Sequence, residues 1–449
     1  MTIRLYTAGA VAAPPPTQPI PNTTRGAVLL DDASPADAPP GAVDVLAAGP
    51  LDRVLAHPAA AAARRTDLSD ATVLLPALAS AHAHLDLTHI GPRPHPEADS
   101  FTDWIAMVVR SRATEPGAVR ASVREGIRRS IRGGVRAVGD IAGVARLEPA
   151  EELRASPLWG VSFVEFFALS DADLRAAREL FERVSDLDDP GATGVALGLS
   201  PHAPYTVRPD ALAAAVAWAD ATDGRRVAMH VAESPEERAF LDPAPDAGPR
   251  GPFRDFLQRV GFWSPDAAPL YDRRVHPVDF AADLAHRSGA MLVHVNDCPD
   301  EQLDRLARGS CAVAYCARAS DYFRQHGAFG PHRYRDMLDA GVPVALGTDS
   351  IVNLPPDEAD RISPLDDARL LRRRDNADAD LLLAMCTTAP ARALGLAPEL
   401  FTLAPGPCAG LLAVDASDAP PGGSAAERAL ASRARPVFLE PAPPAEAAR

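Results

Sequence analysis

Short apolar segments alternate with amphipathic segments through the central part of this 449-residue chain. Apolar runs of this length are typical of buried strands, and they are predicted to end near His84, Asp140, Leu169, Ser200, Ala232, Val295, Cys316 and Gly347. Helices are predicted between them, over about 119–132, 171–186, 208–222, 299–308 and 333–340. Repeated βα units build a parallel sheet, either an open doubly wound one or a (β/α)₈ TIM barrel. Polar residues recur at the C-terminal strand ends, where a barrel carries its active site, and this favours the barrel.

The two ends of the chain have a different pattern. Residues 1 to about 70 are rich in proline, alanine and glycine, and pieces such as Ile3–Tyr6 and Ala27–Leu30 predict strands and loops, not helices. Gly410–Val414 and Pro436–Leu439 have the same strand-like character. We expect strands from both ends to pair in a small satellite sheet, and the tail from Pro441 to be disordered.

Composition and charge exclude several classes of function. The net charge of −15 argues against a nucleic-acid partner. The 45 basic residues include no lysine, which excludes a Schiff-base lysine, a Walker-type lysine and a carboxylated lysine bridging two metals. The 5 cysteines form no CxxC pair, and their odd number favours a reducing compartment. No apolar run is long enough to span a membrane, and the first residues show no charged region followed by a long apolar run, so we expect a cytoplasmic protein.

Three strand ends carry residues of the kind that bind metals. His82 and His84 are two positions apart after an apolar run, so they project from the same face of a strand. His230 lies on another predicted strand, and Glu233 follows three residues later, where a carboxylate can serve as a general base. Asp349 lies just past the last strand. Taken singly, each has an ordinary structural interpretation: surface or core histidines, a surface glutamate, and an aspartate that caps the next helix.

Two further histidines follow the same rule. His294 ends another predicted strand, and His202 lies in a proline-braced loop after a strand. Either could be a structural histidine. Together, however, five of the 12 histidines lie at or just beyond C-terminal strand ends. The joint pattern predicts a metal site.

These motifs resemble the amidohydrolase superfamily, in its chlorohydrolase and nucleoside deaminase branch, over nearly the whole chain. The resemblance rests on Leu74–Leu87 (LLPALASAHAHLDL), Leu199–Thr206 (LSPHAPYT), His230–Glu233 (HVAE) and Leu346–Ser350 (LGTDS). It implies a barrel wrapped by a small β-sandwich that both chain ends form. The predicted division is 1–70 and 396–449 for the sandwich and tail, and 71–395 for the barrel.

The resemblance also implies a mechanism. One divalent ion, Zn²⁺ or alternatively Fe²⁺, is held by His82, His84, His230 and Asp349, and it lowers the pKa of a water. Glu233 and Asp349 carry that water's proton, Glu233 to a ring nitrogen and Asp349 towards the leaving amine. His294 orients the attacking water, and His202 and Trp104 contact the substrate.

The substrate is the open part of this hypothesis. Phe101–Ile105, taken as a loop, and Val138–Ile141 resemble a group of aminofutalosine deaminases, which act on an adenine nucleoside in menaquinone synthesis. That nucleoside carries a benzoate, for which Arg110 or Arg112 is the candidate partner.

Other functions stay open. His294–Cys298 and Cys316–Asp321 depart from the sequences usual in the branch, and both lie where the substrate should be read. The alternatives are a guanine or cytosine deaminase, a triazine-type hydrolase, and a non-catalytic metal-binding barrel. The expected partner is a small nucleoside-like molecule, without nucleic acid or membrane. The sequence does not give the oligomeric state, and a homodimer is the assembly that the resemblance suggests.

Overall fold

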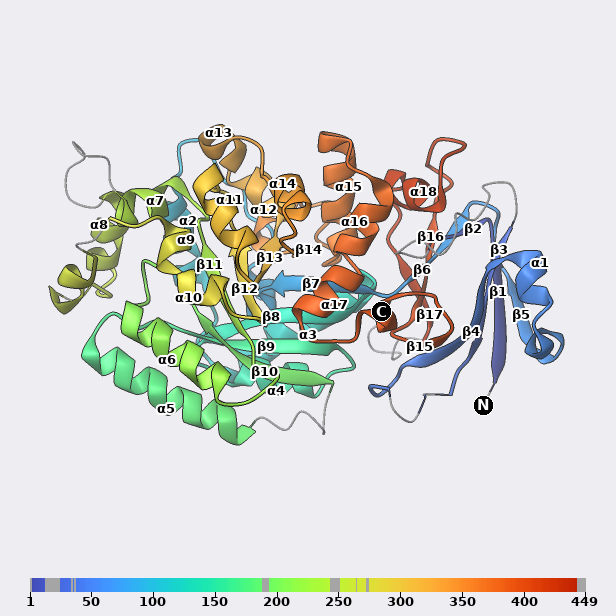
Figure 1. The fold of residues 1–449 in the computed structure, drawn as a ribbon, viewed down its shortest axis with the longest axis horizontal. Helices are drawn as coiled ribbons and strands as arrows, with labels where there is room; N and C mark the ends of the chain where they lie inside the picture. The colour runs from blue at the N-terminus through green and yellow to red at the C-terminus, as the bar shows by residue number, and fades with distance from the viewer. Residues whose placement is uncertain are drawn as a thin grey trace.

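Eight parallel strands form one sheet whose edges meet, so the predicted (β/α)₈ barrel is confirmed (Figure 1). The structure is a computed structural model that describes residues 2–12, 25–33, 35, 38–187, 194–242, 251–263, 265–271 and 274–441. Around the barrel the strands are β7 Leu78–Ala83, β8 Val135–Val144, β9 Trp159–Phe166, β10 Val195–Pro201, β11 Val227–Val231, β12 Ala290–His294, β13 Ala312–Tyr315 and β14 Val344–Leu346. Nearly all their residues are buried, as expected for a parallel sheet covered on both faces.

The barrel closes between β14 and β7. Ala83 forms a parallel bridge with Asp349, and the Thr348 amide donates to the His82 carbonyl at 2.8 Å. The closure is tight at Gly347, where a Cβ atom would lie 2.8 Å from the His82 Cβ. A glycine there lets the last strand approach the first.

Six predicted strand ends lie within one residue of the observed ends. Two were wrong: β8 continues past Asp140 to Val144, and β9 ends at Phe166, before Leu169. Asp140 is a buried polar residue inside an apolar strand, which makes it resemble a strand terminus in the sequence.

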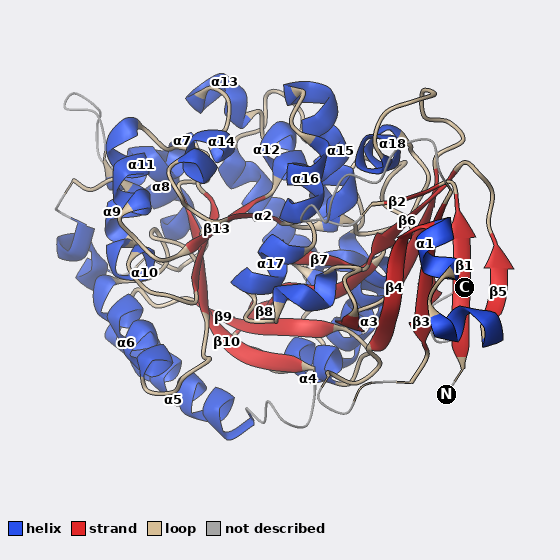
Figure 2. Cartoon of the chain, turned by 45° about the vertical axis from the view of Figure 1, so that its right-hand side comes forward, coloured by secondary structure: helices blue, strands red, loops and turns tan. Residues whose placement is uncertain are grey.

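The predicted helices are present and cover the outside of the barrel (Figure 2). They are α3 Pro116–Arg132, α5 Asp171–Leu187, α6 Pro209–Asp220, α11 Asp300–Ala307 and α14 Tyr334–Asp339. Further helices between the strands or after the last one are α4 Glu148–Arg154, α12 Ala317–Tyr322, α13 Gln325–Phe329, α15 Pro364–Asp375, α16 Ala379–Met385 and α17 Thr388–Ala393. Among the described residues, no helix is both long and apolar enough to cross a bilayer.

Two elements near the barrel mouth were not predicted. The expected loop at Phe101–Ile105 is the start of helix α2 Phe101–Ser111, which a reciprocal capping box between Ser100 and Asp103 begins. Between β11 and β12 the chain makes an excursion that contains α7 Pro235–Leu241, α8 Gly251–Arg259, a 3₁₀ helix at Pro265–Tyr271, α9 Pro277–Phe280 and α10 Ala282–Ala285. The ring of Phe253 on α8 stacks on Tyr205 at 3.9 Å and lies 6.1 Å from Phe101, so the excursion packs against α2. Figure 1 places α8 at the end of the molecule opposite the satellite sheets.

The chain ends form two sheets rather than one. The first contains β15 Gly406–Cys408, β4 Val43–Pro50, β3 Gly26–Asp31, β1 Ile3–Ala8 and β5 Arg64–Asp67, and the second contains β17 Val437–Glu440, β16 Leu411–Asp415, β6 Thr72–Pro76 and β2 Ala10–Val11. Strands from both ends therefore pair, as expected. Helices α1 Leu51–Leu55 and α18 Ala425–Ala431 and the 3₁₀ helix Pro58–Ala62 lie in segments that were expected to hold only strands and loops. Of the expected disordered tail, residues 442–449 lie outside the described residues.

Candidate metal and active site

Three histidines and one aspartate meet where β7, β11 and β14 end. The His84 Nε2 atom lies 3.3 Å from the His230 Nε2 atom. The Asp349 Oδ1 atom lies 3.8 Å from Nε2 of His82 and 3.6 Å from Nε2 of His84. The ring centroid of His82 is 4.9 Å from that of His84 and 5.0 Å from that of His230. The structure thus brings together all four residues predicted to bind the ion.

The hydrogen bonding of these rings fits a bound cation. His82 is fully buried, and neither of its ring nitrogens has a hydrogen-bond partner among the described residues. An unsatisfied buried imidazole is costly, and a cation would give one of its two nitrogens a partner. The Nδ1–H group of His230 donates to the His202 carbonyl at 2.9 Å, which leaves its Nε2 lone pair for a metal. Burial and then the His82 ring lower the pKa of His84 and bring that of His230 to about 4, so both are neutral at pH 7.

Strained backbone holds the residues at these strand ends. Asp349, His294 and Ala232 have positive φ angles of 54°, 74° and 55°. Residues with side chains rarely adopt this conformation, and it gathers at functional sites. The Asp349 carboxylate accepts the Ser350 amide at 2.7 Å and the Asn353 amide group at 3.2 Å, which fixes its direction. Burial opposes its ionisation, but the His82 ring at 3.8 Å and the other neighbouring histidines outweigh burial and lower its pKa.

Glu233 and His294 lie beside the four donors. The Glu233 Oε1 atom is 3.5 Å from the His294 Nε2 atom. Burial, and then repulsion from Asp349, raise the pKa of Glu233 well above its usual value, which favours the protonated form of its carboxyl group. Burial lowers the pKa of His294, so this ring stays neutral. The pair can therefore offer a proton and a lone pair to one reacting group.

Two residues that sequence analysis missed support this pair. The Glu237 carboxylate accepts the amides of Ala232 at 3.0 Å and Glu233 at 2.7 Å, and so holds the strained turn after β11. Its sequence signal was the Ser234-x-x-Glu237 spacing, which marks the start of a helix. The ring of His332 donates to the His294 carbonyl at 2.9 Å and stacks on Tyr315 at 3.7 Å. Nothing in the sequence links His332 to a strand end 38 residues earlier.

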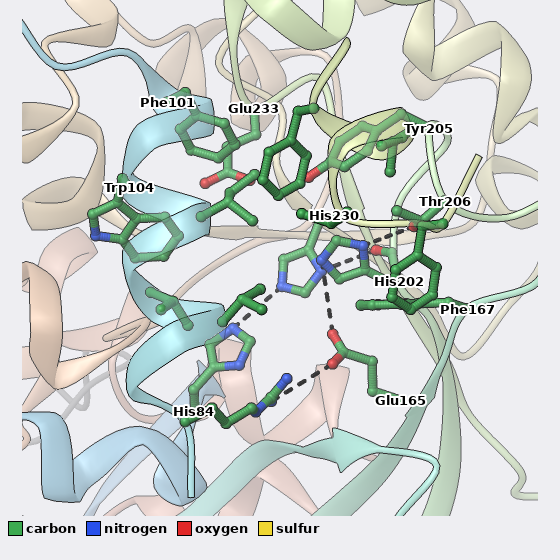
Figure 3. Close-up of a pocket in the computed structure, with 18 of the residues that line it drawn as sticks. His84, Phe101, Trp104, Glu165, Phe167, His202, Tyr205, Thr206, His230 and Glu233 are labelled. Carbon is green, nitrogen blue, oxygen red and sulfur yellow. Dashed lines mark hydrogen bonds and ion pairs between the residues drawn. The ribbon is translucent and has the colours of Figure 1, made fainter. Parts of the chain in front are cut away.

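A cavity opens above these groups (Figure 3). Its polar lining consists of His84, Arg112, Glu165, His202, Thr206, His230, Glu233, His294 and Asp349. Its apolar and aromatic lining consists of Leu87, Phe101, Trp104, Ile105, Val108, Val109, Phe167, Tyr205, Phe256, Leu257, Val260 and Phe262. Val109, Val260 and Phe262 are exposed and mark the opening. Both predicted substrate contacts, His202 and Trp104, line this cavity, and α2 and α8 form much of its outer wall.

A buried ionic cluster forms one side of the cavity. Arg112 donates from Nε to the Asp86 Oδ2 atom at 3.1 Å, and its NH2 atom lies 2.9 Å from the same oxygen and 3.7 Å from Glu165 Oε2. Burial raises the pKa of Glu165 to about 7 against the opposing effect of Arg112, and raises that of Asp140 to about 8. Arg112 is thus already paired, and Arg110 is exposed and does not line the cavity.

A second group of metal donors overlaps the first. Ligand atoms of Glu165, His202 and His230 all lie within 4.8 Å of one another. His230 belongs to both groups, however, and its Nδ1 atom is bonded to a carbonyl. Since Arg112 also lies beside Glu165, the geometry favours a single ion at the first group.

A family model and a curated protein both match most of this chain. The model of the Amidohydrolase family matches residues 73–442. The chain is 30% identical over 293 residues to an aminodeoxyfutalosine deaminase of Deinococcus radiodurans, a match that covers 63% of this chain and 64% of that protein. The chain therefore spans slightly less than two thirds of this curated relative.

Solved structures share the fold. The aminofutalosine deaminase of Helicobacter pylori in complex with methylthio-coformycin superposes with a TM-score of 0.72 at 19% identity, covering 97% of this chain and 98% of that one. An adenosine deaminase from Xanthomonas campestris with bound zinc superposes with a TM-score of 0.65 at 20% identity, covering 96% and 89% of the two chains. At these identities the likeness concerns the fold alone.

Proposed function

Because this chain belongs to the amidohydrolase family, we propose that it is a metal-dependent hydrolase that removes the amino group from C6 of an adenine-type nucleoside. The observation that carries the proposal is the meeting of His82, His84, His230 and Asp349 beside the buried carboxyl group of Glu233. The similar deaminases support the nucleoside class. A nucleoside of the aminofutalosine type is the expected substrate, which would place the enzyme in menaquinone synthesis.

One divalent ion is proposed, with His82, His84, His230 and Asp349 as its ligands. Three imidazoles and one carboxylate are a donor set that suits zinc, and the zinc bound to the Xanthomonas relative supports this choice over Fe²⁺. When bound, the ion lowers the pKa of a water towards neutrality and so supplies a nucleophile.

The residues of the chain then move the protons. The oxygen of the water forms a bond to C6 while Asp349 takes its proton, and Glu233 gives a proton to the adjacent ring nitrogen. The neutral His294 ring orients the water. The C6–N bond breaks as the amine receives a proton through Asp349 and leaves as ammonia. The hydrogen that remains on the new C6 oxygen passes to Glu233 as the carbonyl forms, so both carboxyl groups end with the number of protons they had at the start.

The partner, the location and the oligomeric state are also proposals. The substrate is a small molecule, and the net charge of −15 disfavours nucleic acid as a partner. A cytoplasmic location is supported by the 5 cysteines, which are all unpaired and buried. A homodimer stays a prediction.

The test is a screen for ammonia release with aminofutalosine, S-adenosylhomocysteine, adenosine, guanine, cytosine and an aminotriazine, on one preparation whose metal content is measured. We expect release from the adenine nucleosides, with the highest kcat/KM for aminofutalosine. Release from guanine, cytosine or the triazine alone would overturn the nucleoside assignment. Metal binding without release from any compound would support the non-catalytic barrel.

A further inference from the structure

Glu165 is a buried carboxylate that faces the cavity without a close partner. It lies on β9 and is 2% exposed, yet it lines the cavity. Its side chain has ionic neighbours at 3.7 Å, the Arg112 guanidinium, and at 3.9 Å, the His202 Nε2 atom. Within the described part of the chain, no group donates a hydrogen bond to it at 3.5 Å or less. Buried carboxylates are normally hydrogen-bonded, so this one points to a donor that arrives with a ligand.

Arg112 does not serve as the hydrogen-bond donor to Glu165, because its guanidinium is paired with Asp86. Its Nε atom donates to Asp86 at 3.1 Å and its NH2 atom lies 2.9 Å from the same oxygen. The guanidinium therefore stays at the side of Glu165, where its charge partly balances the carboxylate. An anionic ligand group would meet Glu165 and Asp86 here, so the ligand group that binds is neutral and donates hydrogen bonds.

The position of Glu165 in the cavity indicates which part of a bound nucleoside its carboxylate would contact. Its carboxylate lies within 4.8 Å of ligand atoms of His202 and His230 (Figure 3). His230 is one of the proposed metal ligands, so Glu165 lies next to the proposed metal centre. The base must reach that centre, and the exposed apolar residues Val109 and Val260 mark the opening. If the base reaches that centre, the sugar extends from it towards the opening, along the wall that holds Glu165.

We infer that Glu165 binds the ribose hydroxyl groups of the substrate, and that the enzyme therefore selects ribosides over free bases and deoxyribosides. Two neighbouring hydroxyls can donate to the two oxygens of one carboxylate, and Arg112 keeps the carboxylate in place. This inference rests on the proposed function, because it assumes that the base is deaminated at the metal centre. Binding of the ribose hydroxyl groups would also distinguish a nucleoside deaminase from enzymes whose substrate is a free base or a triazine ring.

The experiment compares adenosine with 2′,3′-dideoxyadenosine, which keeps the reacting base and lacks both hydroxyls. A hydrogen bond to a charged group corresponds to roughly a 10- to 100-fold change in binding. We expect the wild-type enzyme to prefer adenosine by about that factor in kcat/KM, mainly through KM. In Glu165→Gln the preference should fall below about threefold. Glu151→Gln, the same change at an exposed ion pair on α4, should keep the wild-type preference.

Each outcome bears on the inference. Equal kcat/KM for the two nucleosides in the wild-type enzyme overturns it without any variant, so a poorly folded Glu165→Gln would not hide the answer. An unchanged preference in a folded Glu165→Gln also overturns it, while deamination itself still stands. If no nucleoside is deaminated but a free base or triazine is, the proposed function fails first and the inference fails with it.

Discussion

At the scale of single residues, Glu233 carries the proton transfer in the proposed reaction. Glu233→Gln keeps the size of the side chain and removes its acidic proton, so turnover should fall by at least about 10²-fold. The metal content and the melting temperature should stay near those of the wild-type protein, because Glu233 is not among the proposed ligands. Steady-state kinetics and elemental analysis of one sample check both parts. A variant with near wild-type turnover would show that the glutamate after His230 has no role in catalysis.

The same scale shows what the sequence could predict about the site. His82 and His84 were predictable because alternation on a strand puts them on one face, and each other proposed ligand lies within three residues of an apolar run. Glu165 and His332 were not, because they act through contacts with residues far away in the sequence. Arg112 was singled out as an anion partner, but only the structure shows that Asp86 already holds it. Long-range pairing of this kind has no local signature.

At the scale of elements, the turn between β11 and α7 fixes the direction of Glu233. Glu237 accepts two buried backbone amides in this turn, at 3.0 and 2.7 Å, and Ala232 has a φ of 55°. Glu237→Ala would leave both amides unsatisfied, at a cost of about 1–3 kcal/mol each. We expect a loss of about 2–6 kcal/mol in the free energy of unfolding and a lower kcat.

Urea denaturation and kinetics of three variants test this role. Glu237→Gln can still accept one amide and should recover part of the stability and of kcat. Glu236→Ala, one position away, removes a single partly buried bond to the Phe101 amide and should cost about 1 kcal/mol or less. Equal effects of Glu237→Ala and Glu236→Ala would mean that the turn does not depend on the carboxylate.

The closure of the barrel is a second property of elements. A Cβ atom on Gly347 would lie 2.8 Å from the His82 Cβ and 2.9 Å from the Cys316 Sγ atom. Gly347→Ala should therefore push β14 away from β7 and cost about 1–3 kcal/mol, as overpacking does. Because His82 would move, we also expect weaker metal binding.

A matched substitution separates crowding from the general effect of adding a methyl group. Gly117 lies near the start of α3, where an added Cβ atom would meet nothing within 4 Å beyond its own helix. Gly117→Ala should leave stability unchanged or raise it by about 0.5–1 kcal/mol, since alanine is the better helix former. Chemical denaturation and zinc titration of both variants make the comparison. A Gly347→Ala protein as stable as Gly117→Ala would contradict the tight closure.

At the scale of the whole molecule, the alternation of strands and helices predicted the barrel, and the apolar pieces at both ends predicted that these ends pair. The excursion between β11 and β12 was missed because its helices are short and interrupted by prolines such as Pro265 and Pro269. Its packing against α2 depends on rings from distant segments, Phe253 with Tyr205 and Phe101. Periodicity predicts elements that repeat, whereas the outer wall of the cavity is built from elements that do not.

The metal should link this site to the stability of the whole barrel. Its proposed ligands come from the first, fifth and last strands, so a bound ion ties distant parts of the chain together, and without it both nitrogens of the buried His82 have no partner among the described residues. A ligand present at a thousandfold excess over its Kd stabilises the folded state by about 4 kcal/mol. We therefore expect chelation to lower the Tm by about 5 °C or more, and added zinc to restore it.

Elemental analysis before and after chelation should give about one and then no tightly bound ion per chain, because the donors around His230 cannot serve two ions and no lysine is available to bridge them. Asp349→Asn is the control: with a ligand charge removed, its Tm should respond little to zinc. The converse result would be a wild-type Tm that stays constant while the ion is lost, which would mean that the four donors are held in place by the barrel alone. Two stoichiometric ions would contradict the site itself, since each other donor group among the described residues shares His230 or Asp349 with the first. A single ion whose removal loosens the barrel is the outcome that the hydrogen bonding of these rings predicts.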